Sequence, residues 1–222
     1  MGAVGRGVGV ALVVGLGLVG CGSNDNDQGI SFRAVGIFQG EQQEDQCQVP
    51  VVDNAIGDPG ISVPLNSPLV DGGYPDSNSF LSFCRGFLQL ENNLGFQRTQ
   101  DGNVVEQEGE AINVERIDFE YEIPGARIAI PSNSMPTGFR INPFFGPENS
   151  FGRPNVIFVQ LDGQLVPSAL VQFLRQNQPS LPQLPYVMII HIRVRGRTDS
   201  GELLVSNEIR YTVEWLPGDD AL

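Results

Sequence analysis

The sequence contains no lysine: all 13 of its basic residues are arginine, and it has a single histidine. Without lysine the chain cannot form a Schiff base, supply the lysine of a phosphate-binding loop or build a Ser-Lys dyad. One histidine cannot form a multi-histidine metal centre, although it could act alone as a general base. These absences exclude several common classes of enzyme before any fold is considered.

Positive charge is also scarce, because 26 acidic residues against 13 arginines give the chain a net charge of −13. Binding to nucleic acid by counterion release needs a basic face, so we expect no nucleic-acid partner. Hydrophobic residues make up 41% of the chain, which is normal for a folded domain. The composition therefore predicts an acidic, folded protein.

The N-terminus has the order of a secretory signal. Residues 1–6 carry one positive side chain, Arg6, and no acid, and an apolar run of 14 residues follows from Gly7 to Gly20. A helix of that length spans roughly 21 Å, which is less than the ~30 Å hydrocarbon core of a bilayer. We interpret the run as the hydrophobic region of a signal peptide and not as a membrane span.

The apolar run ends in Leu18-Val19-Gly20-Cys21, which resembles the lipobox of bacterial lipoprotein signal peptides. The resemblance covers the first tenth of the chain. It implies cleavage before Cys21, a lipid on the sulfur of Cys21 (palmitate among the acyl groups) and an acylated amino group, hence attachment to a membrane through lipid. Gly22, in place of an aspartate, favours the outer membrane, and otherwise the outer face of the cytoplasmic membrane. The alternative is an ordinary secretory signal with a chance cysteine.

The rest of the chain divides simply. We expect a cleaved signal at 1–20, the lipidated cysteine with a flexible polar tether at 21–29, and one folded domain at 30–222. Cys47 and Cys84 then remain as an even pair in an oxidising compartment, and we predict a disulfide between them. In the chain-entropy model such a bridge contributes ~4 kcal/mol and would secure a segment rich in proline and glycine. The alternative is two separately buried thiols.

Alternation of apolar and polar residues dominates after residue 30 and predicts an all-β domain. We expect a single β-sandwich that resembles the immunoglobulin-like or fibronectin-like arrangement, with one short helix in a crossover. The helix is indicated by apolar residues at helical spacing in 166–174, behind Pro167. The strands are expected at 30–38, 80–90, 112–123, 127–130, 155–161, 187–197, 202–205 and 209–215.

Two rows of charge lie on the polar faces of two of these strands. The acidic row is Asp118, Glu120 and Glu122, and the basic row is His191, Arg193, Arg195 and Arg197. In an immunoglobulin-like order the two strands are neighbours, so the rows predict a cross-strand ladder on the outer face of a sheet. The last strand adds Glu208, Arg210 and Glu214 on its polar side.

Two functional alternatives to this structural ladder stay open. The face could bind a ligand, or its carboxylates could be catalytic, because same-face residues ~6.7 Å apart match the carboxylate separation of an inverting glycosidase. His191 has no serine elbow motif or second histidine beside it, so a nucleophile-activating role has no support. We interpret His191 as a structural member of the face.

The segment 125–154 is rich in proline and glycine and is interpreted as a long loop. It carries the aromatic and basic residues Phe139, Arg140, Phe144, Phe145, Phe151 and Arg153. Phenylalanine and arginine are favoured at interface cores, so this segment is the candidate for contact with a partner. Alternatively, its phenylalanines pack into the edge of the core.

No cofactor and no metal site is predicted, because no calcium loop of the D-x-D-x-D-G kind with a distal glutamate occurs. A calcium site assembled from distant loops stays open. The leading hypothesis is a lipid-anchored, non-enzymatic envelope lipoprotein, a binding or structural module for an envelope protein or glycan. The rival is a carbohydrate-active enzyme using paired carboxylates. Carboxylates facing each other across a pocket would favour the enzyme, and salt-bridged acids on a flat face the module.

Overall fold

The structure is a computed structural model, and the part of the chain that it describes lies between residues 31 and 217. The described ranges are 31–43, 46–50, 56–58, 60–66, 86–94, 96–98, 104–106, 109–143, 155–161 and 163–217. The predicted signal peptide, the lipidated Cys21, the tether and Cys84 lie outside these ranges. The side chain of Cys47 also lies outside the description, so the disulfide stays a prediction.

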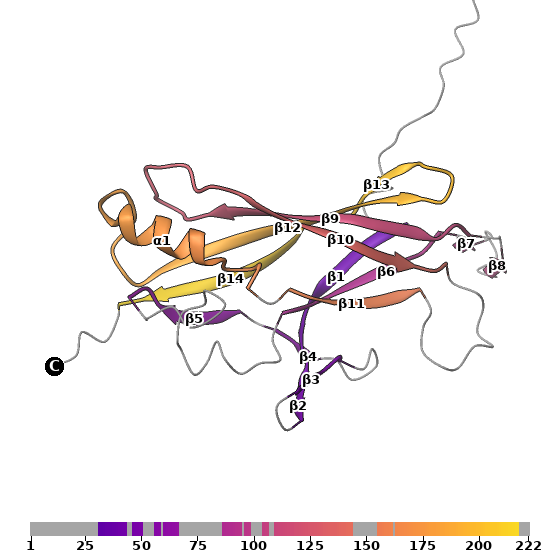
Figure 1. Ribbon diagram of the computed structural model, residues 1–222, viewed down its shortest axis with the longest axis horizontal. Helices are drawn as coiled ribbons and strands as arrows, with labels where there is room; N and C mark the ends of the chain where they lie inside the picture. The colour runs from indigo at the N-terminus through magenta and orange to yellow at the C-terminus, as the bar shows by residue number, and fades with distance from the viewer. Residues whose placement is uncertain are drawn as a thin grey trace, which may run out of the picture.

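The larger sheet has the strand order β10-β9-β12-β14-β5 (Figure 1). Its strands are β5 (Ile61–Pro64), β9 (Ile112–Glu122), β10 (Asn133–Ile141), β12 (Tyr186–Thr198), β13 (Leu203–Val205) and β14 (Ile209–Leu216). The short β13 pairs with the end of β12, and β5 pairs with β14 in parallel. The other pairs are antiparallel. The long strands β9 and β12 form the middle of this six-stranded sheet.

The smaller sheet has the order β11-β6-β1-β4. Its strands are β1 (Phe32–Gln39), β4 (Ile56–Gly57), β6 (Phe87–Asn92) and β11 (Val156–Gln160). Two separate hairpins complete the described strands: β2 (Glu41–Gln43) with β3 (Gln46–Gln48), and β7 (Phe96–Arg98) with β8 (Val104–Glu106).

The core lies between the sheets, where the apolar residues predicted to alternate along the strands are buried. The inner faces of both sheets and the helix contribute to one cluster, and its largest fully buried side chains include Trp215, Phe32 and Phe119. Each large aromatic side chain buried in this way contributes on the order of 2–3 kcal/mol. The all-β class with sandwich-like packing and one short helix is thereby confirmed.

The helix α1 (Ser168–Gln176) forms where the spacing of apolar residues predicts it, directly after Pro167. It buries Leu170, Val171 and Leu174 and lies beside one end of β12 and β14 (Figure 1). Arg175 donates from Nε to the carbonyl oxygen of Leu65 at 2.7 Å, and a 3-10 turn, η2 (Gln178–Ser180), follows. Within the described ranges no helix is long and apolar enough to cross a membrane.

One predicted strand has the wrong phase over half of its length. Alternation from Ile30 to Phe38 places Gly36 and Phe38 on the buried face, but a β-bulge between Ala34 and Gly36 reverses the phase. As a result Ile37 is buried, while Phe38 is half-buried and makes an edge-to-face contact with Phe158. The ring centroids are 6.0 Å apart.

The prediction for the segment after β9 is wrong in two respects. Residues 127–130 form no strand, and residues 133–141, interpreted as loop, form β10. β10 is an edge strand, where Pro136 and Gly138 are tolerated because the outer edge has no ladder to maintain. At a register shift between Pro136 and Phe139, the hydroxyl of Thr137 donates to the carbonyl oxygen of Val114 at 2.6 Å.

Two amide side chains, Asn92 and the half-buried Asn207, join the two sheets. Asn92, at the end of β6 and fully buried, donates from Nδ2 to the carbonyl oxygens of Glu110 (2.8 Å) and Ile141 (3.0 Å). Asn207, before β14, donates to the carbonyl oxygen of Ala34 and accepts from its N–H, both at 2.9 Å. Each amide therefore substitutes for a strand partner where the two sheets meet.

Candidate functional site

The predicted charged face exists, and it lies on the outer side of β9 and β12. The two strands are antiparallel neighbours, with Arg193 opposite Asp118, His191 opposite Glu120 and Arg195 opposite Arg116. Side chains on the other side of both strands are buried in the core. Acidic and basic residues therefore share one sheet face, as the alternation predicts.

The ion pairs join residues that are diagonal to each other on neighbouring strands, and not residues that are directly opposite in the register. Arg195 donates from Nε to Oδ2 of Asp118 at 2.8 Å, although Arg193 is the residue opposite Asp118. Arg116 approaches Oδ1 of the same carboxylate from its own strand, with Nε at 2.9 Å. Diagonal neighbours on a twisted antiparallel pair are within reach of long side chains. One carboxylate therefore holds two guanidinium groups side by side.

His191 is placed between two carboxylates. Its Nδ1 lies 2.8 Å from Oε1 of Glu208, and its Nε2 lies 3.0 Å from Oε2 of Glu122. The hydrogen bond with Glu208 raises the pKa of His191; partial burial opposes this, and the bond with Glu122 adds to it. With both ring nitrogens facing acceptors, the geometry suits the doubly protonated imidazolium.

Glu208 is the acid with the most contacts on this face. Besides His191 it accepts from Nη2 of Arg193 at 2.6 Å and from Nε of Arg210 at 3.3 Å. These contacts, the His191 hydrogen bond first, lower the pKa of Glu208 against the opposing effect of burial. The alternation predicts Glu208 on the polar side of the last strand. Its contact with His191 depends on the pairing register of β12 and β14, which cannot be derived from the sequence.

A β-bulge extends the ladder by one acid that the rows do not contain. Between Arg195 and Gly196 the register with β9 shifts, so that Glu115 and Arg116 both point outward. Arg197 donates from Nε to Oε1 of Glu115 at 2.9 Å, with both side chains about half exposed. Strict period-two alternation gives no signal for Glu115.

The segment proposed as a partner-contact loop is only partly described. Phe139 lies on β10 and is 43% exposed, so it keeps the exposure that a contact residue needs. Arg140 donates from both terminal nitrogens to Asp199 at 2.7 Å each, which raises the pKa of Arg140 and lowers that of Asp199. The other four predicted contact residues, Phe144, Phe145, Phe151 and Arg153, lie outside the described ranges.

Arginine is concentrated on this face. Among the described residues, β9, β10, β12 and β14 carry six of the chain's 13 arginines and five of its 26 acids on this face. Asp199 and Glu208, which pair with Arg140 and Arg193, bring the acids to seven, so the face is nearly neutral while the chain carries −13. The arginines are Arg116, Arg140, Arg193, Arg195, Arg197 and Arg210. An anionic ligand is therefore repelled far less here than by the average surface of the protein.

A hollow of about 420 Å³ opens on the charged face beside Asp118. Ser132, just before β10, and Ser134, on β10, line it, and their short side chains leave room next to the long ones of β9 and β12. Its charged walls are formed by Arg116, Asp118, Glu120, His191, Arg193 and Arg195. We call this volume the arginine hollow.

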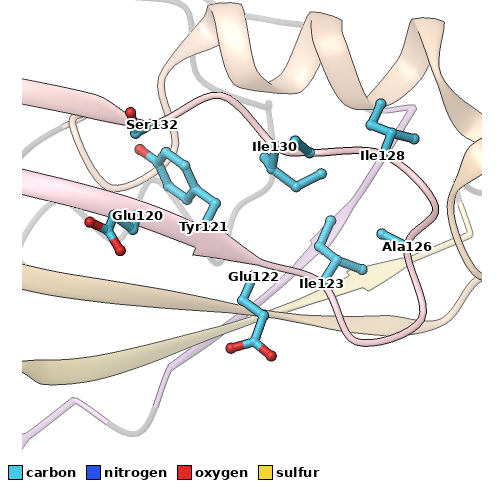
Figure 2. Close-up of a pocket in the computed structure, with 9 residues that line it drawn as sticks. Glu120, Tyr121, Glu122, Ile123, Ala126, Ile128, Ile130 and Ser132 are labelled. Carbon is cyan, nitrogen blue, oxygen red and sulfur yellow. The ribbon is translucent and has the colours of Figure 1, made fainter.

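A second hollow of about 440 Å³ lies at the end of β9, beyond its last pairing with β10. Its walls include Ile123, Ile128 and Ile130, and Glu120 and Glu122 also line it. Figure 2 shows these two carboxylates on the opposite side of β9 from Tyr121 and Ile123. The hydroxyl of Tyr121 instead donates to the carbonyl oxygen of Gln164 at 3.3 Å, and burial raises the pKa of Tyr121.

The carboxylates do not form an opposed catalytic pair in the described part of the chain. Asp118 is held by two arginines and Glu122 by His191, and both carboxylates lie along one strand. No group of three potential metal ligands comes together within the described ranges. The chain matches no protein-family model, no curated protein and no solved structure.

Proposed function

We propose that this protein is a lipid-anchored envelope lipoprotein that acts as a binding module without catalytic activity. The observation that carries the binding role is the charged outer face of β9 and β12, where arginine is gathered in an otherwise acidic chain. Arginine is enriched at recognition surfaces because its planar guanidinium makes several directed hydrogen bonds. The anchor is supported by the lipobox that ends in Cys21.

The placement and the ion pairs of the acidic residues on β9 favour the module over a carboxylate-based enzyme. A glycosidase needs one protonated and one ionised carboxyl group on opposite sides of a sugar. Here Asp118 accepts from Nε of Arg195 at 2.8 Å and lies 2.9 Å from Nε of Arg116, so its carboxylate is occupied by two guanidinium groups of the protein itself. Glu120 and Glu122 follow Asp118 on the same face of β9, so these acids do not face one another across a cleft.

The anchor is tested by fractionating cells that express the full chain with Cys21 intact or changed by Cys21→Ser. The intact chain should be recovered with membranes and carry acyl groups by mass spectrometry, and the variant should carry none. Acylation that persists in the variant would contradict a lipid at Cys21.

The binding role is tested by placing a photo-crosslinking residue at Ser134, which is exposed beside the arginine hollow. The matched control is the same residue at Arg33, which is exposed on β1 of the smaller sheet. We expect a reproducible adduct from Ser134 and not from Arg33. Equal labelling from both positions, or none from Ser134, would contradict a binding role for this face.

A further inference from the structure

The arginine hollow contains hydrogen-bond donors that the protein itself does not use. Arg195 and Arg116 meet Asp118 through their Nε atoms, and within the described ranges their terminal nitrogens have no hydrogen-bond acceptor. The two residues are direct cross-strand neighbours, so the shared carboxylate holds both guanidinium groups at one place. Such a pair presents several N–H groups in the planar arrangement that matches the oxygens of an oxyanion.

The charges at the hollow select the kind of anion. Three arginines line it, Arg116, Arg193 and Arg195. Asp118 offsets part of their charge, and so does Glu208, which accepts from Arg193 at 2.6 Å. A phosphate group carries up to two negative charges and three acceptor oxygens, so it can use more of these donors than a single carboxylate can. The serine hydroxyls of Ser132 and Ser134, on the opposite wall, are further hydrogen-bond donors.

Glu120 adds an acceptor to the same hollow. In register it stands opposite His191, but both ring nitrogens of His191 contact other carboxylates. Within the described ranges the carboxylate of Glu120 therefore has no ion-pair partner, although it lines the hollow. An ionised carboxylate accepts hydrogen bonds from hydroxyl groups and repels a second anion. It suits the hydroxyl-bearing part of a ligand whose phosphate lies at the arginines.

We propose that the arginine hollow binds a phosphorylated polyol, with its phosphate on Arg116 and Arg195 and its hydroxyl groups on Glu120. Arg193 and Ser134 flank Asp118 and complete the phosphate side. The inference deepens the proposed function, because it names the ligand class of the same face. It does not depend on the lipid anchor.

The test measures binding of three probes to the purified full chain in a non-ionic detergent by isothermal titration calorimetry at low salt. The probes are inorganic phosphate, glycerol 3-phosphate and glycerol. We expect saturable binding of both phosphates, with glycerol 3-phosphate at least about threefold tighter, and no binding of glycerol. Absence of saturable phosphate binding overturns the proposal.

Matched variants locate the site. Arg195→Gln should weaken both phosphates by about tenfold, the usual effect of losing a charge-assisted hydrogen bond. Arg197→Gln, two residues along on the same face and outside the hollow, should change either affinity by less than about twofold. Arg116→Gln provides a second variant in the hollow, in which Asp118 keeps Arg195. Equal weakening by Arg195→Gln and Arg197→Gln would mean diffuse attraction and overturn the site.

Glu120→Ala, which removes both the charge and the acceptor oxygens, separates the polyol from the phosphate. Removing a negative charge from the hollow should leave the affinity for inorganic phosphate unchanged or higher, and should abolish the advantage of glycerol 3-phosphate. If glycerol 3-phosphate still binds more tightly than inorganic phosphate after this change, the assignment of the polyol to Glu120 is overturned. If the chain binds no phosphate but the photo-crosslinking residue at Ser134 still yields its adduct, only this inference is disproved. If the chain binds phosphate but Ser134 yields no adduct, the proposed partner is disproved instead.

The phosphate group could come from a free polyol or from a lipid headgroup. Co-sedimentation of the Cys21→Ser chain, which lacks the proposed lipid anchor, with phosphatidylglycerol vesicles, compared with phosphatidylcholine vesicles, distinguishes the two sources. If the chain prefers phosphatidylglycerol vesicles and Arg195→Gln removes this preference, the ligand is a lipid headgroup. Equal sedimentation with both, together with saturable binding of glycerol 3-phosphate, assigns the free polyol.

Discussion

The two sheets are joined at Asn92 by a buried amide, which we call the buried joint, and the outer face of β9 and β12 carries the exposed ladder of ion pairs. Both are polar, yet their surroundings differ greatly. Asn92 is neutral, fully buried and makes three hydrogen bonds, two donated from Nδ2 and one accepted by Oδ1 from the N–H of Leu94. The ladder holds many charges, but pairs such as Arg197 and Glu115 are about half exposed. Water competes for an exposed pair and not for a buried amide. The joint should therefore dominate stability, and the ladder should serve register and recognition.

The largest effect is expected from Asn92→Ala. It removes three hydrogen bonds, including the buried one to the carbonyl oxygen of Ile141, so we expect the free energy of unfolding to fall by about 2–4 kcal/mol. Urea denaturation followed by tryptophan fluorescence measures this change. Asn113→Ala is the control, since Asn113 is a partly exposed asparagine on the outer face, and it should cost less than about 0.5 kcal/mol. Similar losses from both variants would contradict the comparison.

A smaller loss is expected at the second joint. Asn207→Ala removes the two hydrogen bonds to the backbone of Ala34 and should lower the free energy of unfolding by about 1–2 kcal/mol. Asn207→Asp keeps the acceptor for the N–H of Ala34 and loses the donor, so its effect isolates the bond to the carbonyl oxygen. The same denaturation experiment applies. If Asn207→Ala is neutral, Asn207 does not join the sheets energetically.

The ladder should respond to pH at His191. Because its folded-state pKa is raised, its contribution to stability is complete below the unfolded pKa of about 6.5 and is lost as pH rises through the folded value. Its neighbours are Glu120 and Glu122 on β9, Glu208, and Arg210 on β14. Glu208 has a lowered pKa, so its contribution is present above its unfolded value and lost only in acid.

We therefore expect His191→Gln to reduce the free energy of unfolding by up to about 1 kcal/mol at pH 5.5 and by less at pH 8.5. Urea denaturation at both pH values, compared with the unmodified chain, gives the difference. A penalty that is equal at both pH values, or larger at pH 8.5, would show that His191 is not held as an imidazolium.

The smallest effect is expected where the ladder is most exposed. Arg197→Gln breaks the pair with Glu115 and should change the free energy of unfolding by less than about 0.5 kcal/mol, with little difference between low and high salt. A loss approaching that of Asn92→Ala would reverse the ranking of joint and ladder.

Much of the central sheet could be predicted from alternation alone. From Ile117 to Tyr121 in β9 and from Tyr186 to Val194 in β12 every second residue is apolar and buried, so strands with one charged outer face follow directly. The helix α1 could also be predicted from the sequence, because its apolar residues recur at helical spacing after Pro167. β10 could not be predicted, since Pro136 and Gly138 indicate a break and only pairing with β9 makes the segment extended.

The composition and order of residues therefore determined the acidic, all-β character of this protein and its two charged rows, and they predict a lipoprotein signal at the N-terminus. These properties depend on local chemistry and a period of two along single strands. Tertiary structure alone decided which charges meet, because the diagonal contacts of Arg195 and His191 depend on register, twist and bulges between distant strands. It also decided that Asn92 is buried and that the short serines Ser132 and Ser134, at the start of β10, line the arginine hollow, since both depend on what an adjacent strand places beside them.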